Sequence, residues 1–116
     1  MRTISLLLRD DWGALQRVLQ TLTKKRVRVE TVLYGRCEQP GQNRVFIASA
    51  DEKLPRMVEH LRKLGDVAEA ECLEGGPRGY ALVRVVEERV PLPMSMDLDT
   101  AKAIAEGAAK EEEERR

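Results

Sequence analysis

The chain has 116 residues, of which 42% are hydrophobic and 34% charged, and its 20 basic residues balance its 20 acidic ones. This length fits one domain with a modest core, and two complete domains would be cramped. The balanced charge gives the chain no overall electrostatic attraction to nucleic acid or to an anionic membrane, and the 3% aromatic content is too low for a base-stacking platform.

The first part of the chain predicts two strands separated by a helix. Residues 3–9 (TISLLLR) form a short apolar run that is typical of a buried strand. Over about 12–25, apolar residues recur every three or four positions, which predicts a helix with one apolar stripe. That stripe consists of Leu15, Val18, Leu19 and Leu22. Residues 27–37 alternate with period two, which predicts a second strand. Its two faces carry Val27, Val29, Thr31 and Leu33 on one side and Arg28, Glu30, Val32 and Tyr34 on the other. The face with Arg28, Glu30 and Tyr34 is expected to be solvated surface or a partner interface.

The next segments complete a symmetrical pattern. Pro40-Gly41 predicts a turn, so the run 44–50 should return as an antiparallel strand. Apolar residues between 54 and 64 predict a second helix, with Pro55 in its first turn and Gly65 at its end. Residues 66–74 alternate again and predict a fourth strand. The order β-α-β-β-α-β predicts an α+β, ferredoxin-like fold, a four-stranded antiparallel sheet with two helices on one face.

We expect this domain to occupy residues 1–75. Residues 76–96 form a linker in which 80–90 has the composition of one further strand, and "PLPM" (91–94) interrupts it. Residues 97–116 form a charged, helix-prone and weakly amphipathic tail whose final Glu/Arg block is expected to be solvated or frayed. One sheet face is left without helices, and two edge strands stay open, which a monomer must protect or pair.

Outside residues 9–18, the sequence contains few residues that suggest a functional site. The start "MRTISLLLRDD" is interrupted by charge too early for a signal peptide or a membrane span, so we expect a cytoplasmic protein. Cys37 and Cys72 have no zinc-site spacing and should lie on opposite edges of the sheet, which makes a mutual disulfide improbable. The lone His60 is expected at the surface. No nucleophile–base arrangement stands out, and we expect neither an enzyme nor a bound cofactor or metal.

The stretch "RDDWGALQRV" (9–18) opens the first helix and allows two interpretations. Asp11 or Asp10 can simply cap the helix, a contribution of about 1 kcal/mol. Alternatively, Gly13, a poor helix former, leaves the backbone open to close approach by a ligand. A helix N-terminus attracts a carboxylate, and an adjacent Asp can accept hydrogen bonds from an ammonium group. Together these features suit a free α-amino acid.

The sequence resembles the ACT-domain family at this stretch. Asp10, Gly13 and Leu15 match its signature Asp-x-Pro-Gly-x-Leu in register. Within the family, the likeness is to the small regulatory subunit of acetolactate synthase. It rests on "ISLLL", "GALQRVLQTL", "VRVETV" and "LRKLGDVAEAECLE" within residues 2–74, and weakly on "ALVRV". Beyond "ALVRV", we do not expect residues 76–116 to form the second domain that the longer small subunits carry.

The resemblance implies a non-catalytic homodimer that binds valine, or another branched-chain amino acid, between two ACT domains. It also implies a partner, the large thiamine-diphosphate-dependent subunit, which the small subunit activates and places under feedback inhibition. The first strand–helix loop of one copy would meet the helix–strand turn of the other. The effector-binding positions would be Asp10, Asp11, Trp12, Gly13, Ala14, Leu15 and Arg28.

The chain departs from the family at several of these positions. Trp12 replaces a small residue or proline, and Asp10 stands where these subunits carry a loop asparagine. The turn that typically reads Gly-aromatic-Asn-Ile is "RVRV" here, so Arg26 replaces the glycine and Arg28 the asparagine. Arg28 can clamp a ligand carboxylate, or it can pair directly with Asp10 of a second copy. The second case gives an oligomerisation module whose binding site is filled by its own side chains. A phosphate-binding enzyme of the acylphosphatase type is disfavoured, because two carboxylates at this turn would repel phosphate.

Overall fold

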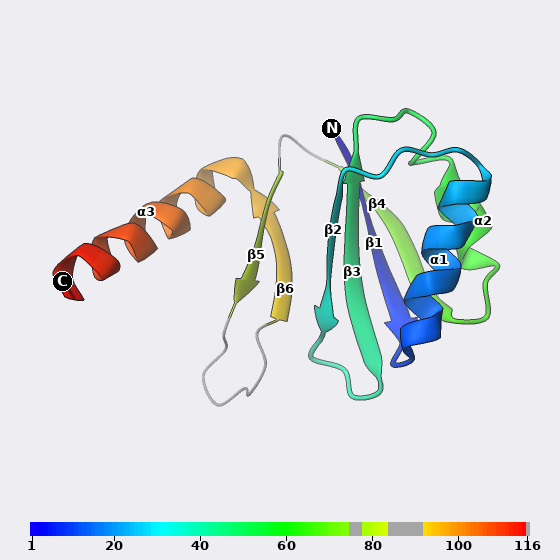
Figure 1. Cartoon of the computed structure of the whole chain (residues 1–116), viewed down its shortest axis with the longest axis horizontal. Coiled ribbons are helices and arrows are strands. Elements are labelled where there is room, and N and C mark those ends of the chain that lie inside the picture. The colour runs from blue at the N-terminus through cyan, green and yellow to red at the C-terminus, as the bar shows by residue number, and fades with distance from the viewer. Residues whose placement is uncertain (75–77, 84–91, 116) are drawn as a thin grey trace.

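The computed structural model describes residues 1–74, 78–83 and 92–115 of the chain. Its elements are, in chain order, β1 (Arg2–Arg9), α1 (Trp12–Lys24), β2 (Thr31–Arg36), β3 (Gln42–Ser49), α2 (Met57–Arg62), β4 (Val67–Leu73), β5 (Arg78–Val83), β6 (Leu92–Asp97) and α3 (Leu98–Arg115). In Figure 1, a larger sheet separates α1 and α2 on one side from the β5–β6 hairpin on the other, and α3 projects away from the sheet.

The larger sheet is antiparallel and has the strand order β2-β3-β1-β4. Both crossovers, through α1 and α2, pass over the same face (Figure 1). This confirms the predicted α+β architecture and is compatible with a ferredoxin-like fold. The central strand β1 is buried at every position from Thr3 to Leu8. Such a strand reads as a continuous apolar run because both of its faces are covered.

The core lies between the sheet and the two helices. The predicted stripe of α1 is confirmed, with Leu15, Val18 and Leu22 buried and Leu19 packed on their border. These side chains belong to one cluster with Ile4, Leu6 and Leu8 of β1, and with Leu54 and Leu61 from the segment around α2.

Helix α1 ends in a Schellman motif. The Arg26 N–H donates to the Thr23 carbonyl at 2.9 Å, and the Val27 N–H donates to the Leu22 carbonyl at 3.0 Å. Arg26 itself adopts a φ of 55°, the left-handed conformation that favours glycine. Val27 is buried against the helix end, which explains why an apolar residue stands there.

The second strand is shorter than predicted. It begins at Thr31 rather than at residue 27, because Val27 belongs to the end of α1. The alternation within the strand is confirmed, since Val32 pairs with the core residue Ile47 and Tyr34 with Val45. Tyr34 therefore packs against the core on the helix side, and the prediction that it lies on a solvated or partner-facing surface is wrong for this side chain.

Other boundaries also moved. The turn at Pro40-Gly41 is confirmed, with Gly41 at a φ of 78°, and β3 begins at residue 42 rather than 44. The predicted helix 54–64 shrinks to Met57–Arg62, because residues 52–56 form successive turns, such as the one in which the Leu54 N–H donates to the Asp51 carbonyl at 3.1 Å. The apolar pattern was still informative, since the side chain of Leu54 is fully buried.

The C-terminal part forms a hairpin and a helix. β6 pairs antiparallel with β5, and Pro93 lies opposite Leu82, so the prediction that residues 91–94 interrupt the strand pattern is wrong over 92–94. Proline is compatible with such an outer strand, where its missing N–H faces no partner. Residues 84–90 of the predicted strand lie outside the described residues. Asp97 caps α3 by accepting the Thr100 N–H at 3.0 Å, and α3 confirms the helix predicted for the tail.

The hairpin packs on the sheet face that faces away from α1 and α2. The Tyr80 ring lies 6.1 Å from the Phe46 ring, and the Tyr80 hydroxyl forms a hydrogen bond with the Thr3 hydroxyl. The face that the topology was expected to leave bare is therefore partly covered by the chain's own C-terminal part. This explains why Thr3 and Phe46, which point away from the helices, are buried.

Candidate functional site

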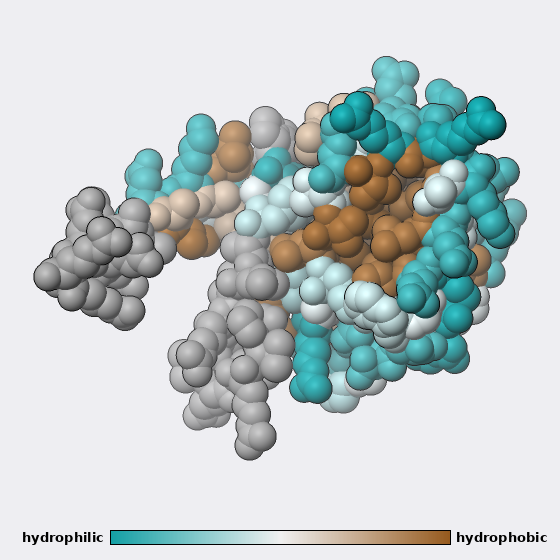
Figure 2. Space-filling view, in the orientation of Figure 1, coloured by the Kyte–Doolittle hydropathy of each residue, from teal (hydrophilic) through white to brown (hydrophobic). Residues whose placement is uncertain are grey.

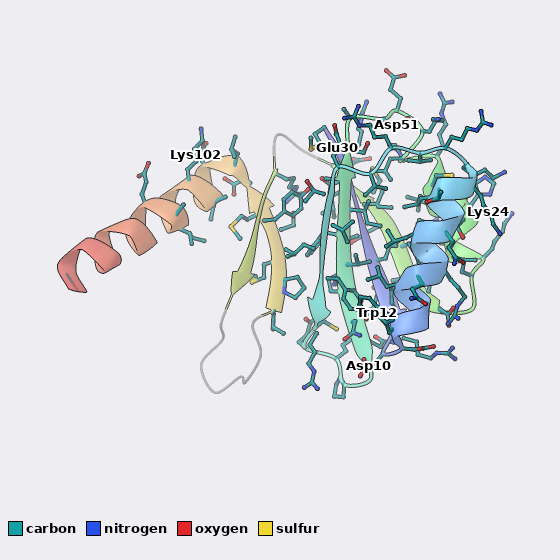
Figure 3. The ribbon with its side chains drawn as sticks, in the orientation of Figure 1. Asp10, Trp12, Lys24, Glu30, Asp51 and Lys102 are labelled. Carbon is teal, nitrogen blue, oxygen red and sulfur yellow. The ribbon has the colours of Figure 1, made fainter. Side chains whose placement is uncertain are left out.

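The β1–α1 corner is the end of the molecule at which Asp10 and Trp12 lie (Figure 3). The Asp10 N–H donates to the Gly41 carbonyl at 2.9 Å, which ties the loop to the β2–β3 turn. The Asn43 amide nitrogen, on a side chain that is almost fully buried, donates to Asp10 Oδ1 at 2.9 Å and to the Tyr34 hydroxyl at 2.7 Å. These two hydrogen bonds fix the orientation of Asp10.

Trp12 forms the outer aromatic wall of this corner. Its side chain is 64% exposed and rests edge-on against Tyr34, with ring centroids 5.8 Å apart and an interplanar angle of 74°. This is a favourable aromatic arrangement. Trp12 therefore stands beside Asp10 as an accessible apolar surface rather than folding into the core.

Asp11 caps α1, which confirms the structural interpretation for this carboxylate. Its Oδ1 accepts the Gly13 N–H at 3.0 Å, and its backbone carbonyl accepts the Ala14 N–H at 2.9 Å. A Cβ added at Gly13 would lie 3.0 Å from the Arg17 guanidinium. The close approach that Gly13 permits is therefore made, within this chain, by Arg17.

An ion-pair network that sequence reasoning missed surrounds the cap. Arg17 hydrogen-bonds Asp66, in the turn before β4, and lies 3.1 Å from Asp11 Oδ2. Arg9 also reaches Asp66, at 2.7 Å. The hydrogen bond donated by Arg17 is the largest influence holding the pKa of Asp66 below its ordinary value. Arg17 is separated from Asp66 by 49 residues, and no local pattern signals that contact.

The network leaves one charge of the corner uncompensated. Two arginines, Arg9 and Arg17, balance two carboxylates, Asp11 and Asp66. Asp10 instead has the neutral Asn43 as its side-chain partner, and it forms no ion pair within the described residues. A carboxylate beside an exposed indole attracts a cationic group such as an ammonium.

The remaining predicted site residues lie elsewhere. Ala14 and Leu15 are buried in the core and support α1 from beneath. Arg28 is exposed, its backbone N–H donates to Asp51 at 3.0 Å, and its guanidinium lies 3.7 Å from Glu30. Glu30 and Asp51 are at the end of the sheet opposite Asp10 (Figure 3). Within one chain the structure therefore brings together Asp10, Trp12 and Gly13, but not Arg28.

The two edges of the sheet differ in how they are protected. At β4, the Arg62 guanidinium donates to the Ala70 carbonyl at 3.0 Å, and the β1–β4 register shifts between Leu7 and Leu8, which marks a bulge at Ala68. Both devices discourage pairing with another strand. At β2 the apolar residue Val32 is 39% exposed, and Figure 2 shows a hydrophobic patch between β2 and α1.

The lone histidine and the two cysteines fit their structural interpretation. His60 is exposed, and Cys37 and Cys72 are free thiols near opposite edges of the sheet. Within the part of the chain that the structure describes, no group of three His, Cys, Asp or Glu residues is placed to hold a metal ion. None of the described helices combines the length and the apolar character needed to cross a bilayer.

Comparison with known proteins leaves the family open. None of the protein-family models matches the chain, and no curated protein matches it.

Proposed function

We propose that the chain is an ACT-like, non-catalytic regulatory module that binds a free α-amino acid between two copies of itself. The observation that carries the proposal is the β1–α1 corner, where a pre-oriented Asp10 without an ion-pair partner among the described residues stands beside the exposed Trp12. The corner is close to the edge strand β2, which β6 approaches but does not pair with. The resemblance to the small subunit of acetolactate synthase suggests what the module regulates, namely the synthesis of branched-chain amino acids under feedback control.

The edge strand supports a particular dimer. Unlike β4, β2 carries no bulge in its register with β3 and exposes Val32. If two β2 strands pair antiparallel about a two-fold axis, the end of one strand meets the start of the other. Tyr34, near the end of β2, is linked through Asn43 to Asp10, whereas Arg28 lies just before β2 begins. This pairing brings Arg28 of a second copy towards the Asp10 corner.

The resulting composite site matches the groups of an α-amino acid. Asp10 accepts from the ammonium, Arg28 of the second copy clamps the carboxylate, and Trp12 with Val32 offers apolar surface to the side chain. A ligand that binds one dimer arrangement better than another shifts the equilibrium between them, and a preference of about 1–3 kcal/mol is enough for regulation. The partner that reads this shift would be the large catalytic subunit of acetolactate synthase, which supplies the thiamine diphosphate chemistry.

The second candidate is the same dimer with no effector. The Arg17 guanidinium already occupies the space beside Gly13 and pairs with Asp11. Part of this corner is therefore filled by a side chain of the same copy. Arg28 of a second copy can do the same to Asp10, so that the chain's own side chains plug the site. The chain would then be an oligomerisation module.

The experiment is a thermal-shift panel of the common amino acids, combined with light scattering for oligomeric state. A true effector at 100 times its Kd stabilises the protein by about 2.7 kcal/mol. The shift should occur with a branched-chain member, vanish in Asp10→Ala, and persist in Glu52→Gln, a control at an exposed carboxylate outside the corner. If the protein is a dimer and no amino acid raises its melting temperature, the chain is the oligomerisation module without an effector. A monomer that Val32→Lys leaves unchanged refutes both candidates. Activation of an acetolactate synthase large subunit on mixing tests the partner.

A further inference from the structure

A hollow lies beside β4 and opens on the sheet face away from α1 and α2. It has a volume of about 480 Å³, in the range of small-molecule sites. Its polar lining comes from Ser5, Arg44, Glu69 and Glu71, and its apolar lining from short side chains such as Ala68. We refer to it as the β4 hollow. It contains none of the residues of the β1–α1 corner.

The cationic group of the β4 hollow is Arg44. On β3 it lies opposite Leu7 of β1, so it projects from the face that carries the hairpin. Its side chain is only 19% exposed, and it forms a long ion pair of 3.9 Å with the exposed Glu38. One guanidinium nitrogen donates to the Ser5 hydroxyl at 3.1 Å, and Ser5 is buried. A guanidinium has five N–H donors, so this largely desolvated cation retains unused donors.

The anionic groups are on the neighbouring strand. Ser5 pairs directly with Glu71, and Leu7 pairs with Glu69, so both carboxylates are on the same face as Arg44. Neither glutamate forms an ion pair within the described residues. Because adjacent strands are about 4.8 Å apart, a guanidinium held over Ser5 lies one strand away from these carboxylates.

The bulge gives the hollow its shape. Between the pairs Leu7–Glu69 and Leu8–Val67, the extra residue Ala68 bends β4 locally. Arg62 borders the hollow, but its guanidinium is engaged by Glu59 and by the Ala70 carbonyl. Among the described residues that line the hollow, Arg44 is therefore the cation available to a ligand.

We propose that the β4 hollow binds a small zwitterion, an α-amino acid with a short side chain. The carboxylate binds the unused donors of Arg44, the ammonium lies between Glu69 and Glu71, and the short side chain faces Ala68. A simple anion such as phosphate is disfavoured because it would meet both glutamates, and a simple amine is disfavoured by Arg44. The proposal does not depend on the dimer or on the β1–α1 corner.

The test is an amide NMR titration of the full chain with four matched probes. L-alanine carries both charges, propionate only the negative one, ethylamine only the positive one, and inorganic phosphate serves as the simple anion. We expect L-alanine alone to shift the amides of residues 68–71 in a saturable manner, with a Kd on the order of 1 mM. Arg44→Met should weaken this binding about ten-fold or more, as expected for a lost charge-assisted contact. Arg56→Met, at an exposed arginine outside the hollow, should leave it unchanged.

A second variant keeps the proposal testable if Arg44→Met disturbs the fold. The double change Glu69→Gln and Glu71→Gln, at two exposed positions, should weaken L-alanine binding and strengthen propionate binding. Equal binding of L-alanine, propionate and phosphate would overturn the proposal, and so would an absence of shifts at residues 68–71. Shifts confined to residues 10–14 would overturn this proposal and support the proposed function. Shifts at residues 68–71 in a protein that stays monomeric would support this proposal and overturn the proposed function.

Discussion

Replacing Arg26 with glycine should stabilise the protein. Arg26 has a φ of 55° at the position after α1 where the Schellman motif normally places glycine. For a residue with a Cβ, this left-handed conformation costs roughly 1–2 kcal/mol. The Arg26 side chain is exposed, and its carbonyl, which accepts from Lys53 Nζ at 2.8 Å, is retained in the variant.

The net gain is smaller than the removed strain. Glycine loses more backbone entropy on folding, which offsets roughly 0.5–1 kcal/mol. We therefore expect Arg26→Gly to raise the free energy of unfolding by about 0.5–1 kcal/mol, equivalent to about 2–4 °C in Tm for a chain of this size. In urea, the midpoint should rise by about 0.3–0.5 M at an unchanged m value.

Two controls separate backbone strain from charge. Arg26→Ala removes the same guanidinium but keeps the strained Cβ, so it should not reproduce the gain. Arg28→Gly places glycine at a nearby exposed position without a positive φ, and it should lower stability. All variants are compared at one protein concentration, because self-association shifts apparent stability. If Arg26→Gly is no more stable than Arg26→Ala, the assignment of a strained Schellman position is refuted.

Three further predictions concern contacts between distant segments. Arg17 lowers the pKa of Asp66, so the stability that Asp66 contributes is present above the ordinary carboxyl pKa of about 4 and is lost as the pH falls through its lowered folded value. Asp66→Asn should therefore reduce stability at neutral pH, and its urea midpoint should fall less than that of the wild type as the pH is lowered. An equal fall of the urea midpoint in both proteins would contradict the network. A Cβ on Gly79 would lie 2.1 Å from the Ala101 Cβ, so Gly79→Ala should destabilise the packing of α3 on β5 by about 1–3 kcal/mol. Adding Ala101→Gly to Gly79→Ala removes the clashing Cβ and should restore slow amide exchange in β5. If the double variant exchanges as fast as Gly79→Ala alone, the contact is contradicted. Tyr80→Phe removes the hydrogen bond from β5 to β1 and should cost about 0.5–1.5 kcal/mol, seen as faster amide exchange in the hairpin but not in β1.

The local patterns of the sequence were sufficient for the order of the elements from β1 to β4 and for much of the core. The apolar stripe of α1, the run at β1 and the turn at Pro40-Gly41 each depend on side chains within a few positions of one another. Helix capping is equally local, since Asp11 acts on the N–H of Gly13, two residues away. Such features can be predicted because periodicity and capping involve only neighbouring residues.

Tertiary structure decided the features for which one sequence pattern is compatible with two different structures. Val27 continues the alternation of β2, yet it is buried because it ends α1. Pro93 suggests a break, but an outer strand tolerates it. The role of Gly13 depends on Arg17, whose guanidinium is placed by Asp66 far along the chain. These contacts are set by how separate elements pack, and that packing depends on the sum of many distant interactions rather than on any segment's own side chains.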